Sequence, residues 1–179
     1  MSKASQLNIE FLFIDLSRCA RCQGTDTSLE EALAETTSVL RATGVEVTVQ
    51  KIHVQTEEQA RELGFISSPT IRINGRDIQL GAEVKESLCG SCSGVCGEEG
   101  IGCRVWTYQG KEYTAAPKAM IIDAILREVY GGSSHGTETP RQGRDLSENL
   151  QRFFAAEQRK ERGGESPCGS RSASGKCCD

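Results

Sequence analysis

The amino-acid sequence predicts an α/β fold with the element order β-α-β-α-β-β-α. A cysteine-rich insert precedes the last helix, and a flexible C-terminal tail follows it. Three observations carry the prediction: an apolar run at 9–16 is typical of a buried strand, residues 28–43 have helical periodicity, and an Asn-Gly pair at 74–75 predicts a hairpin.

The first strand is expected at 7–16, because the run is apolar on both faces and so suits the centre of a covered sheet. The first helix is expected at 28–43, where apolar residues recur every three or four positions until Gly44. Thr27 and Glu30 have the spacing of a capping box, which predicts that this helix begins near Ser28.

Valines alternate with polar residues at the start of 45–54, which predicts a second strand. A short helix follows at 56–63. Residues 70–73 and 76–80 flank the Asn-Gly turn as two antiparallel strands. The apolar stripe at 120–129 predicts a well-buried last helix. A strand-helix-strand unit makes a parallel pair, so the predicted sheet is mixed.

The sequence divides into a domain at 1–131, with the insert at 81–117, and a tail at 132–179. Residues 104–113 of the insert resemble a further hairpin. The tail is rich in Gly, Ser, Arg and Glu, a composition typical of disorder. Helical spacing of leucines and phenylalanines at 145–162 predicts a short helix, which we expect to dock on the domain; a partner-binding helix is the alternative.

Composition narrows the classes of function. The chain has 179 residues, nine cysteines and a net charge of −4, with basic residues spread throughout. This distribution favours neither nucleic-acid nor membrane binding, and no nucleotide-binding motif is found. The N-terminal stretch lacks the pattern of a signal peptide, so we expect a cytoplasmic protein. Thiols stay reduced there, and the cysteines are then better explained as ligands or redox centres than as structural disulfides.

Four cysteines lie in the Gly-rich insert, and their thiolates could close a tetrahedral zinc site. A second redox dithiol is the competing interpretation, and passive cysteines are a third. The four residues are Cys89, Cys92, Cys96 and Cys103.

Cys177 and Cys178 are adjacent near the C-terminal end of the sequence, an arrangement that disfavours an ordinary disulfide but can chelate a thiophilic ion. The pair resembles the vicinal cysteines in the tails of mercuric reductases and of some arsenic metallochaperones. By this resemblance the tail would collect an ion and pass it to a buried pair. A tail without a chemical role is the alternative.

Cys19 and Cys22 form a C-x-x-C after the first strand, and Pro69 precedes the third. In this element order they resemble the thioredoxin-like superfamily over 7–131, apart from the insert. Together with the insert and the Cys-Arg-Val-Trp-Thr-Tyr segment, they are similar to a bacterial and archaeal glutaredoxin-like family of unassigned function. The resemblance implies that Cys19 is a nucleophile, that Cys22 resolves the mixed disulfide, and that Pro69 is cis and borders the substrate groove.

Two functions follow as hypotheses. The first is a thiol–disulfide oxidoreductase acting on a protein or small-thiol partner. The second is a non-enzymatic protein that binds or transfers zinc, mercury or arsenic. A helix that begins near Ser28 leaves Cys22 about five residues before its first turn, where the helix dipole has little effect, and such a loose dithiol suits a soft ion. Structural zinc in the insert combined with a redox Cys19 and Cys22 is a third alternative.

Overall fold

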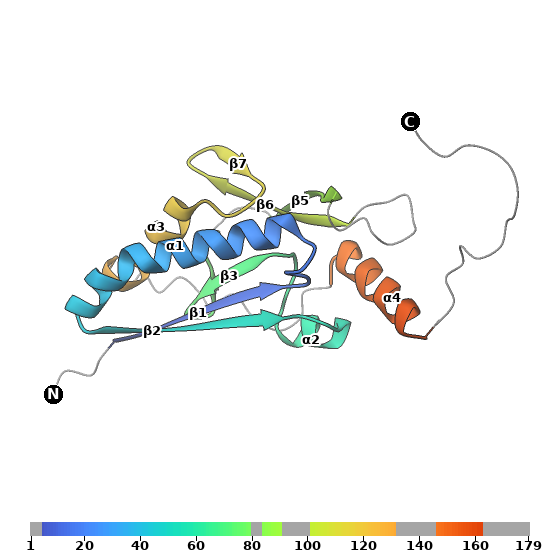
Figure 1. Ribbon diagram of the computed structural model, residues 1–179, viewed down its shortest axis with the longest axis horizontal. Helices are drawn as coiled ribbons and strands as arrows, with labels where there is room; N and C mark the ends of the chain where they lie inside the picture. Colours follow the sequence, from blue (N-terminus) through green and yellow to red (C-terminus); the bar gives the residue numbers. More distant parts are fainter. Residues whose placement is uncertain (1–4, 80–83, 91–100, 132–145, 163–179) are drawn as a thin grey trace, which may run out of the picture.

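The structure, a computed structural model, describes residues 5–79, 84–90, 101–131 and 146–162. The described chain is α/β, with two β-sheets and four helices (Figure 1). The predicted α/β class is therefore confirmed. Of the predicted tail, only the segment 146–162 falls within these ranges.

The larger sheet is mixed and has four strands in the order β2-β1-β3-β4. These are β1 (Ser5–Phe13), β2 (Val45–His53), β3 (Thr70–Ile73) and β4 (Arg76–Asp77). β1 pairs in parallel with β2 and antiparallel with β3, as the strand-helix-strand order and the hairpin predict. Asn74 and Gly75 have φ angles of 49° and 80°, the left-handed values that this tight turn requires.

The smaller sheet is antiparallel, with the order β5-β6-β7, and lies within the predicted insert. Its strands are β5 (Lys85–Leu88), β6 (Gly102–Tyr108) and β7 (Lys111–Tyr113). The predicted hairpin is present, and it turns at Gln109-Gly110 with positive φ at both residues. The strand β5 was not predicted, because it is short and mostly exposed and so lacks an apolar pattern.

The helices are α1 (Ala20–Ala42), α2 (Glu57–Glu62), α3 (Lys118–Tyr130) and α4 (Glu148–Arg162). α1 runs along one face of the larger sheet and contacts α3 (Figure 1). Among the described helices, none combines the length and apolar character that crossing a bilayer would require.

The predicted start of the first helix near Ser28 is wrong, because α1 begins at Ala20. Its buried stripe already contains Cys22 and Thr25 and continues without a break to Leu29 and beyond. The stripe keeps helical spacing from the first turn onward, so burial against the domain overrides the local capping signal at Thr27.

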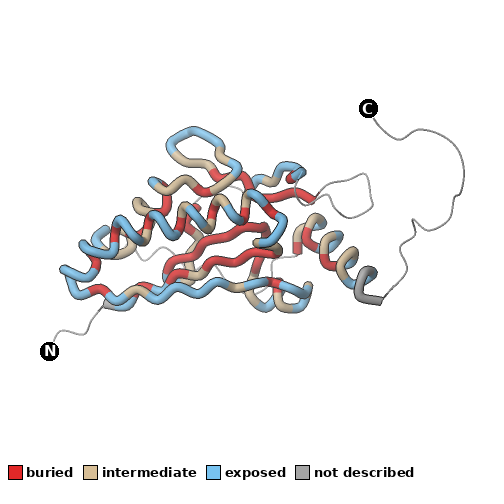
Figure 2. The backbone as a smooth tube through the Cα atoms, viewed as in Figure 1, coloured by how far each residue is buried: buried red, intermediate tan, exposed pale blue. Residues whose placement is uncertain are grey.

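Two hydrophobic clusters lie on opposite faces of β1, because neighbouring residues of a strand point to opposite sides. Phe11 and Phe13 belong to the cluster under α1 and α3, which also contains the buried cysteines. Leu12 and Ile14 belong to the second cluster, with side chains from α2 and α4. Figure 2 shows the buried residues concentrated in β1 and β3, whereas β2 is exposed along most of its length.

The expectation that the 145–162 helix docks on the domain is confirmed. Leu150 and Phe154 of α4 are each 1% exposed and pack in the second cluster, to which Phe153 adds a partly buried ring. α4 also reaches the smaller sheet, where the amide of Asn149 donates a hydrogen bond to Glu86.

Candidate thiolate site

Cys19 is the N-cap residue of α1. Its backbone is extended, and its Sγ accepts a hydrogen bond from the backbone N–H of Cys22 at 3.3 Å. The sulfur therefore occupies the position of a capping oxygen, where the first N–H groups of the helix favour a negatively charged atom. This geometry suits the Cys19 sulfur to act as a ligand for a thiophilic ion.

Cys89 and Cys103 lie on neighbouring antiparallel chains of the smaller sheet. Cys103 is opposite Ser87 in the register of β5 and β6, and the backbone N–H of Cys89 continues the ladder to the carbonyl of Ile101. Residues two apart along a strand point to the same face, so the two cysteines are diagonal neighbours on one face of this sheet.

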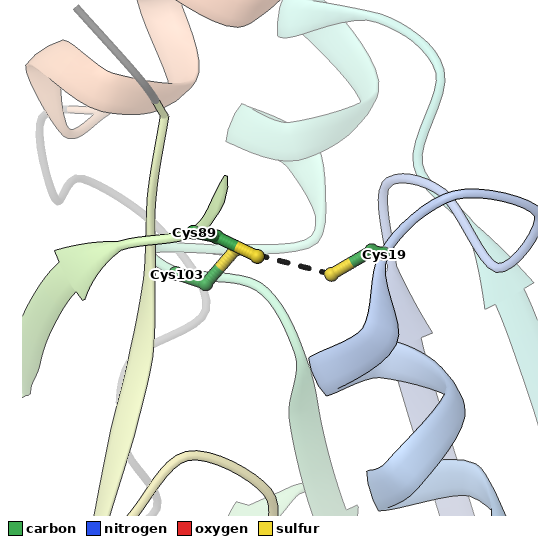
Figure 3. A group of neighbouring side chains, drawn as sticks. All are labelled: Cys19, Cys89 and Cys103. Carbon is green, nitrogen blue, oxygen red and sulfur yellow. Dashed lines mark hydrogen bonds between the residues drawn. The ribbon is translucent and has the colours of Figure 1, made fainter. Parts of the chain in front are cut away.

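The structure brings these two residues to Cys19 (Figure 3). The Sγ atoms of Cys19 and Cys103 are 3.9 Å apart, and all three sulfurs lie within 4.8 Å of one another. None of the three residues is more than 2% exposed. Cys19 lies at the N-terminus of α1, Cys103 lies in β6, and Cys89 directly follows β5, so segments distant in the sequence meet in this group. The three sulfurs are close enough to bind one ion.

Cys22 is buried as well, but its side chain has a different neighbour. Its Sγ lies 3.4 Å from the hydroxyl oxygen of Ser68, and that oxygen also accepts from the backbone N–H of Ile14 at 3.3 Å. The Ser68–Pro69 peptide bond is cis, as predicted. The two thiols of the C-x-x-C thus differ in environment: Cys19 contacts the insert, and Cys22 contacts the segment before β3.

Arg21 connects the first turn of α1 to the smaller sheet. Its Nη1 donates to the Ser87 hydroxyl at 2.9 Å, to the Ser87 carbonyl at 3.3 Å and to the Cys103 carbonyl at 3.2 Å. Its Nη2 donates to the Leu88 carbonyl at 2.8 Å. These acceptors belong to the two residues before Cys89 and to Cys103 itself, so the guanidinium holds Cys89 and Cys103 over the helix terminus.

Arg104 forms a second connection between the sheets. Its guanidinium makes two hydrogen bonds to the Asp77 carboxylate, at 2.7 and 2.8 Å, and a third to Thr70. It stacks on Trp106 at 4.4 Å from the ring centroid. The backbone N–H of Arg104 also donates to the carbonyl of Ser68 at 2.8 Å, so β6 is fixed beside the cis-proline segment.

The loop before Cys19 is held by Asp15. Its Oδ1 accepts from the backbone N–H groups of Ser17 and Arg18 at 2.7 and 3.0 Å, and from the Ser17 hydroxyl. Burial raises the pKa of the Asp15 carboxyl, but these hydrogen bonds outweigh it and hold the pKa below its ordinary value of 3.8. The ionised carboxylate therefore orders the turn that leads into the helix cap.

The sequence predictions separated the first dithiol from the insert, and the structure joins one member of the dithiol, Cys19, to two cysteines of the insert. Cys92, Cys96, Cys177 and Cys178 lie outside the described residues, so the four-cysteine zinc site and the role of the tail stay predictions. Ser68 and the part that Arg21 plays as a connection were missed. Only the positions of these residues in the sequence indicated a role: Ser68 directly precedes Pro69, and Arg21 lies within the C-x-x-C.

Comparison with known proteins gives a match to a family model described as a domain of unknown function (DUF2703), over residues 7–125. Searches of curated proteins and of solved structures gave no match. The matched region contains Cys19, Cys89 and Cys103, whereas Cys177 and Cys178 lie beyond it. Because the match spans more than half of the chain, the protein belongs to the DUF2703 family of domains of unknown function.

Proposed function

We propose that the protein binds a soft metal or metalloid ion through the thiolates of Cys19, Cys89 and Cys103. The observation that carries the proposal is the grouping of three buried sulfurs within 4.8 Å of one another. Three points with that spacing lie no farther than 4.8 Å/√3, about 2.8 Å, from a common centre, against about 2.3 Å in a zinc–thiolate bond. Shifts of a few tenths of an ångström would therefore suffice to seat an ion.

The chemistry of the donors supports a soft ion. Thiolates select thiophilic ions over hard cations such as Mg²⁺ and Ca²⁺, which take oxygen ligands. The low exposure of the three cysteines keeps water from competing for the ion. Small-thiol complexes of the ion are the partners from which we propose that it is acquired, by exchange of their thiolates for those of the protein.

We further propose that the fold is thioredoxin-like. Three features support this assignment: the sheet order β2-β1-β3-β4 with one parallel pair, the C-x-x-C at the start of α1, and the cis-proline before β3. The smaller sheet would then be an addition that supplies two of the three ligands. In this proposal the C-x-x-C contributes one ligand, Cys19, whereas Cys22 has a separate task.

A second candidate function, thiol–disulfide exchange, rests on the 3.9 Å separation of the Cys19 and Cys103 sulfurs. The Cys19 thiolate would attack a substrate disulfide and form a mixed disulfide, releasing one substrate thiolate. The thiolate of Cys103 or Cys22 would then attack the Cys19 sulfur and release the second. The substrate gains two electrons, the protein is left with a disulfide, and a small-thiol reductant restores the dithiol.

The test uses full-length protein, reduced and freed of metal under anaerobic conditions. Native mass spectrometry with one equivalent of Cd(II) should show a single bound ion in the wild type and in Cys22→Ser. Cys19→Ser, Cys89→Ser and Cys103→Ser should each lose it in competition with a chelator. Cys22→Ser is the matched control, because it removes a buried thiol from the same helical turn.

Two outcomes would contradict the proposal. One is retention of Cd(II) by Cys19→Ser and Cys103→Ser, which would place the ion elsewhere. The other is the absence of any bound ion together with catalytic reduction of a disulfide peptide that requires Cys19. That second result would establish the exchange reaction in place of ion binding.

A further inference from the structure

Arg21 brings one positive charge to the edge of the three-thiolate group. Its planar guanidinium carries a delocalised positive charge. Its Nη1 lies 3.2 Å from the carbonyl oxygen of Cys103, and its four hydrogen bonds to described residues go to carbonyl and hydroxyl oxygens of Ser87, Leu88 and Cys103. Within the described ranges these neutral acceptors leave the charge of Arg21 unbalanced, in contrast to Arg104, whose charge is matched by Asp77.

The charge of the bound complex depends on the ion. A divalent ion displaces the protons of three thiols and forms a complex with one net negative charge: M²⁺ + 3 RSH gives M(SR)₃⁻ + 3 H⁺. Arsenite exchanges its hydroxyl groups and forms a neutral complex: As(OH)₃ + 3 RSH gives As(SR)₃ + 3 H₂O. A monovalent ion leaves two net negative charges. The divalent complex is the one that a single arginine neutralises.

Because the three cysteines are buried, the net charge of the bound complex affects the affinity of the site for the ion. Cys19, Cys89 and Cys103 are at most 2% exposed, and an unbalanced charge in such surroundings is costly. The backbone N–H that Cys22 donates to the Cys19 sulfur adds the partial positive charge of the α1 N-terminus. The charge of Arg21 and the partial charge of the helix N-terminus both stabilise an anionic complex, and they contribute much less to the stability of a neutral complex.

We infer that the site selects soft divalent ions over trivalent metalloids, and that Arg21 is the residue that determines this specificity. The inference rests on the proposed function, because it assigns an ion class to the same three thiolates. Arg21 acts on the site through its position and its charge, because it contacts the backbone of Cys103. The atoms that bond to the ion are the three sulfurs.

The experiment measures the affinity of the reduced full-length protein for Cd(II) and for arsenite, each by competition with a small dithiol. Arg21→Gln should weaken Cd(II) binding by about tenfold, corresponding to ~1.4 kcal/mol, and leave arsenite within about twofold. Arg21→Lys should keep the wild-type ratio of the two affinities, because it keeps the charge even where the hydrogen bonds are lost. Arg18→Gln, a charge change on the exposed residue directly before Cys19, should alter neither affinity.

Equal weakening of both probes by Arg21→Gln would overturn the inference, since Arg21 would then only hold the insert in place. The inference would also fail if Arg21→Lys lost as much Cd(II) affinity as Arg21→Gln while arsenite binding stayed unchanged. Failure of the proposed function looks different: Cd(II) and arsenite would then bind Cys19→Ser as tightly as the wild type.

Discussion

Two of the junctions between the smaller sheet and the rest of the molecule are each built on one arginine. At the first, Arg104 is fully buried, paired with Asp77 and stacked on Trp106. At the second, Arg21 is half-buried and donates to backbone carbonyls and one hydroxyl beside the sulfur group. The carboxylate of Asp77 balances the charge of Arg104, whereas among the described residues Arg21 has only neutral acceptors. In our inference the charge of Arg21 is therefore available to a bound ion.

The difference separates stability from function. A buried arginine with a carboxylate partner fixes one arrangement of two sheets, and removing it leaves an uncompensated charge. An arginine whose acceptors are neutral also holds a site together, but the stability of the fold depends less on it. We therefore expect changes at the first junction to lower the free energy of unfolding, and changes at the second to lower ion affinity.

The largest effect is expected from Arg104→Met, which leaves Asp77 without its buried partner. We expect the free energy of unfolding to fall by about 3 kcal/mol in urea denaturation, at an unchanged slope. Arg76→Met is the matched control on β4, the strand that carries Asp77. Its guanidinium is 3.9 Å from Glu128, and both side chains are partly exposed, so the loss should be below about 1 kcal/mol. Similar losses for both variants would remove the distinction between the junctions.

Ion binding should add a further connection between the smaller sheet and α1, because Cys19 is the N-cap of that helix. Cd(II) at a free concentration of one hundred times its dissociation constant should raise the free energy of unfolding by up to about 2.7 kcal/mol. Removal of the ion with a chelator should reverse the gain, and Cys103→Ser should show none of it. A stabilisation of equal size in Cys103→Ser would mean that the ion does not link the smaller sheet to α1.

Thr25 forms a connection that involves no charged group. Its hydroxyl in α1 accepts a hydrogen bond from the backbone N–H of Ala116 at 3.2 Å, where the chain returns from the smaller sheet. Thr25→Val keeps the shape and leaves this buried N–H without its acceptor, at a cost of about 1–2 kcal/mol in thermal or urea unfolding. Thr27→Val, at an exposed position of the same helix, should change the stability little. A loss as large as that of Arg104→Met would contradict the ranking.

The smallest effect is expected from Asp15, which orders the loop before Cys19. Its folded-state pKa is lowered, so its contribution to stability is complete above the unfolded pKa near 3.8 and is lost as the pH falls through the lower folded value. The free energy of unfolding should therefore decline more steeply below pH 4 in the wild type than in Asp15→Asn. Parallel pH profiles for the two proteins would show that Asp15 does not hold this loop.

Local signals predicted the turns, and the strands other than β5. The turn at Asn74-Gly75 needs positive φ at both residues, and few residue pairs tolerate that, so the pair identifies its hairpin directly. Burial of Leu150 and Phe154 was likewise visible in the spacing of the tail helix. These features depend on residues close together in the sequence.

The start of α1 and the sulfur group depend on contacts across the fold. Gly24 and Thr25 are poor helix formers by local propensity, yet Thr25 is buried, and a side chain at Gly24 would come within 3.1 Å of the Ala115 Cβ. Cys19 and Cys103 are 84 residues apart, and they meet only because the smaller sheet docks on the α1 terminus. Cysteine spacing within the insert carries no information about that docking.

The same separation sets an order of events during synthesis. Ribosomes add about 5–20 residues per second, so Cys103 is incorporated about 4–17 s after Cys19, the quotients of 84 residues and these rates. During that interval the nascent chain contains Cys19 and Cys22 but lacks Cys103. In the proposed function, a complete set of ligands therefore exists only after β6 has been translated, and the protein takes up its ion as a late step of its own production.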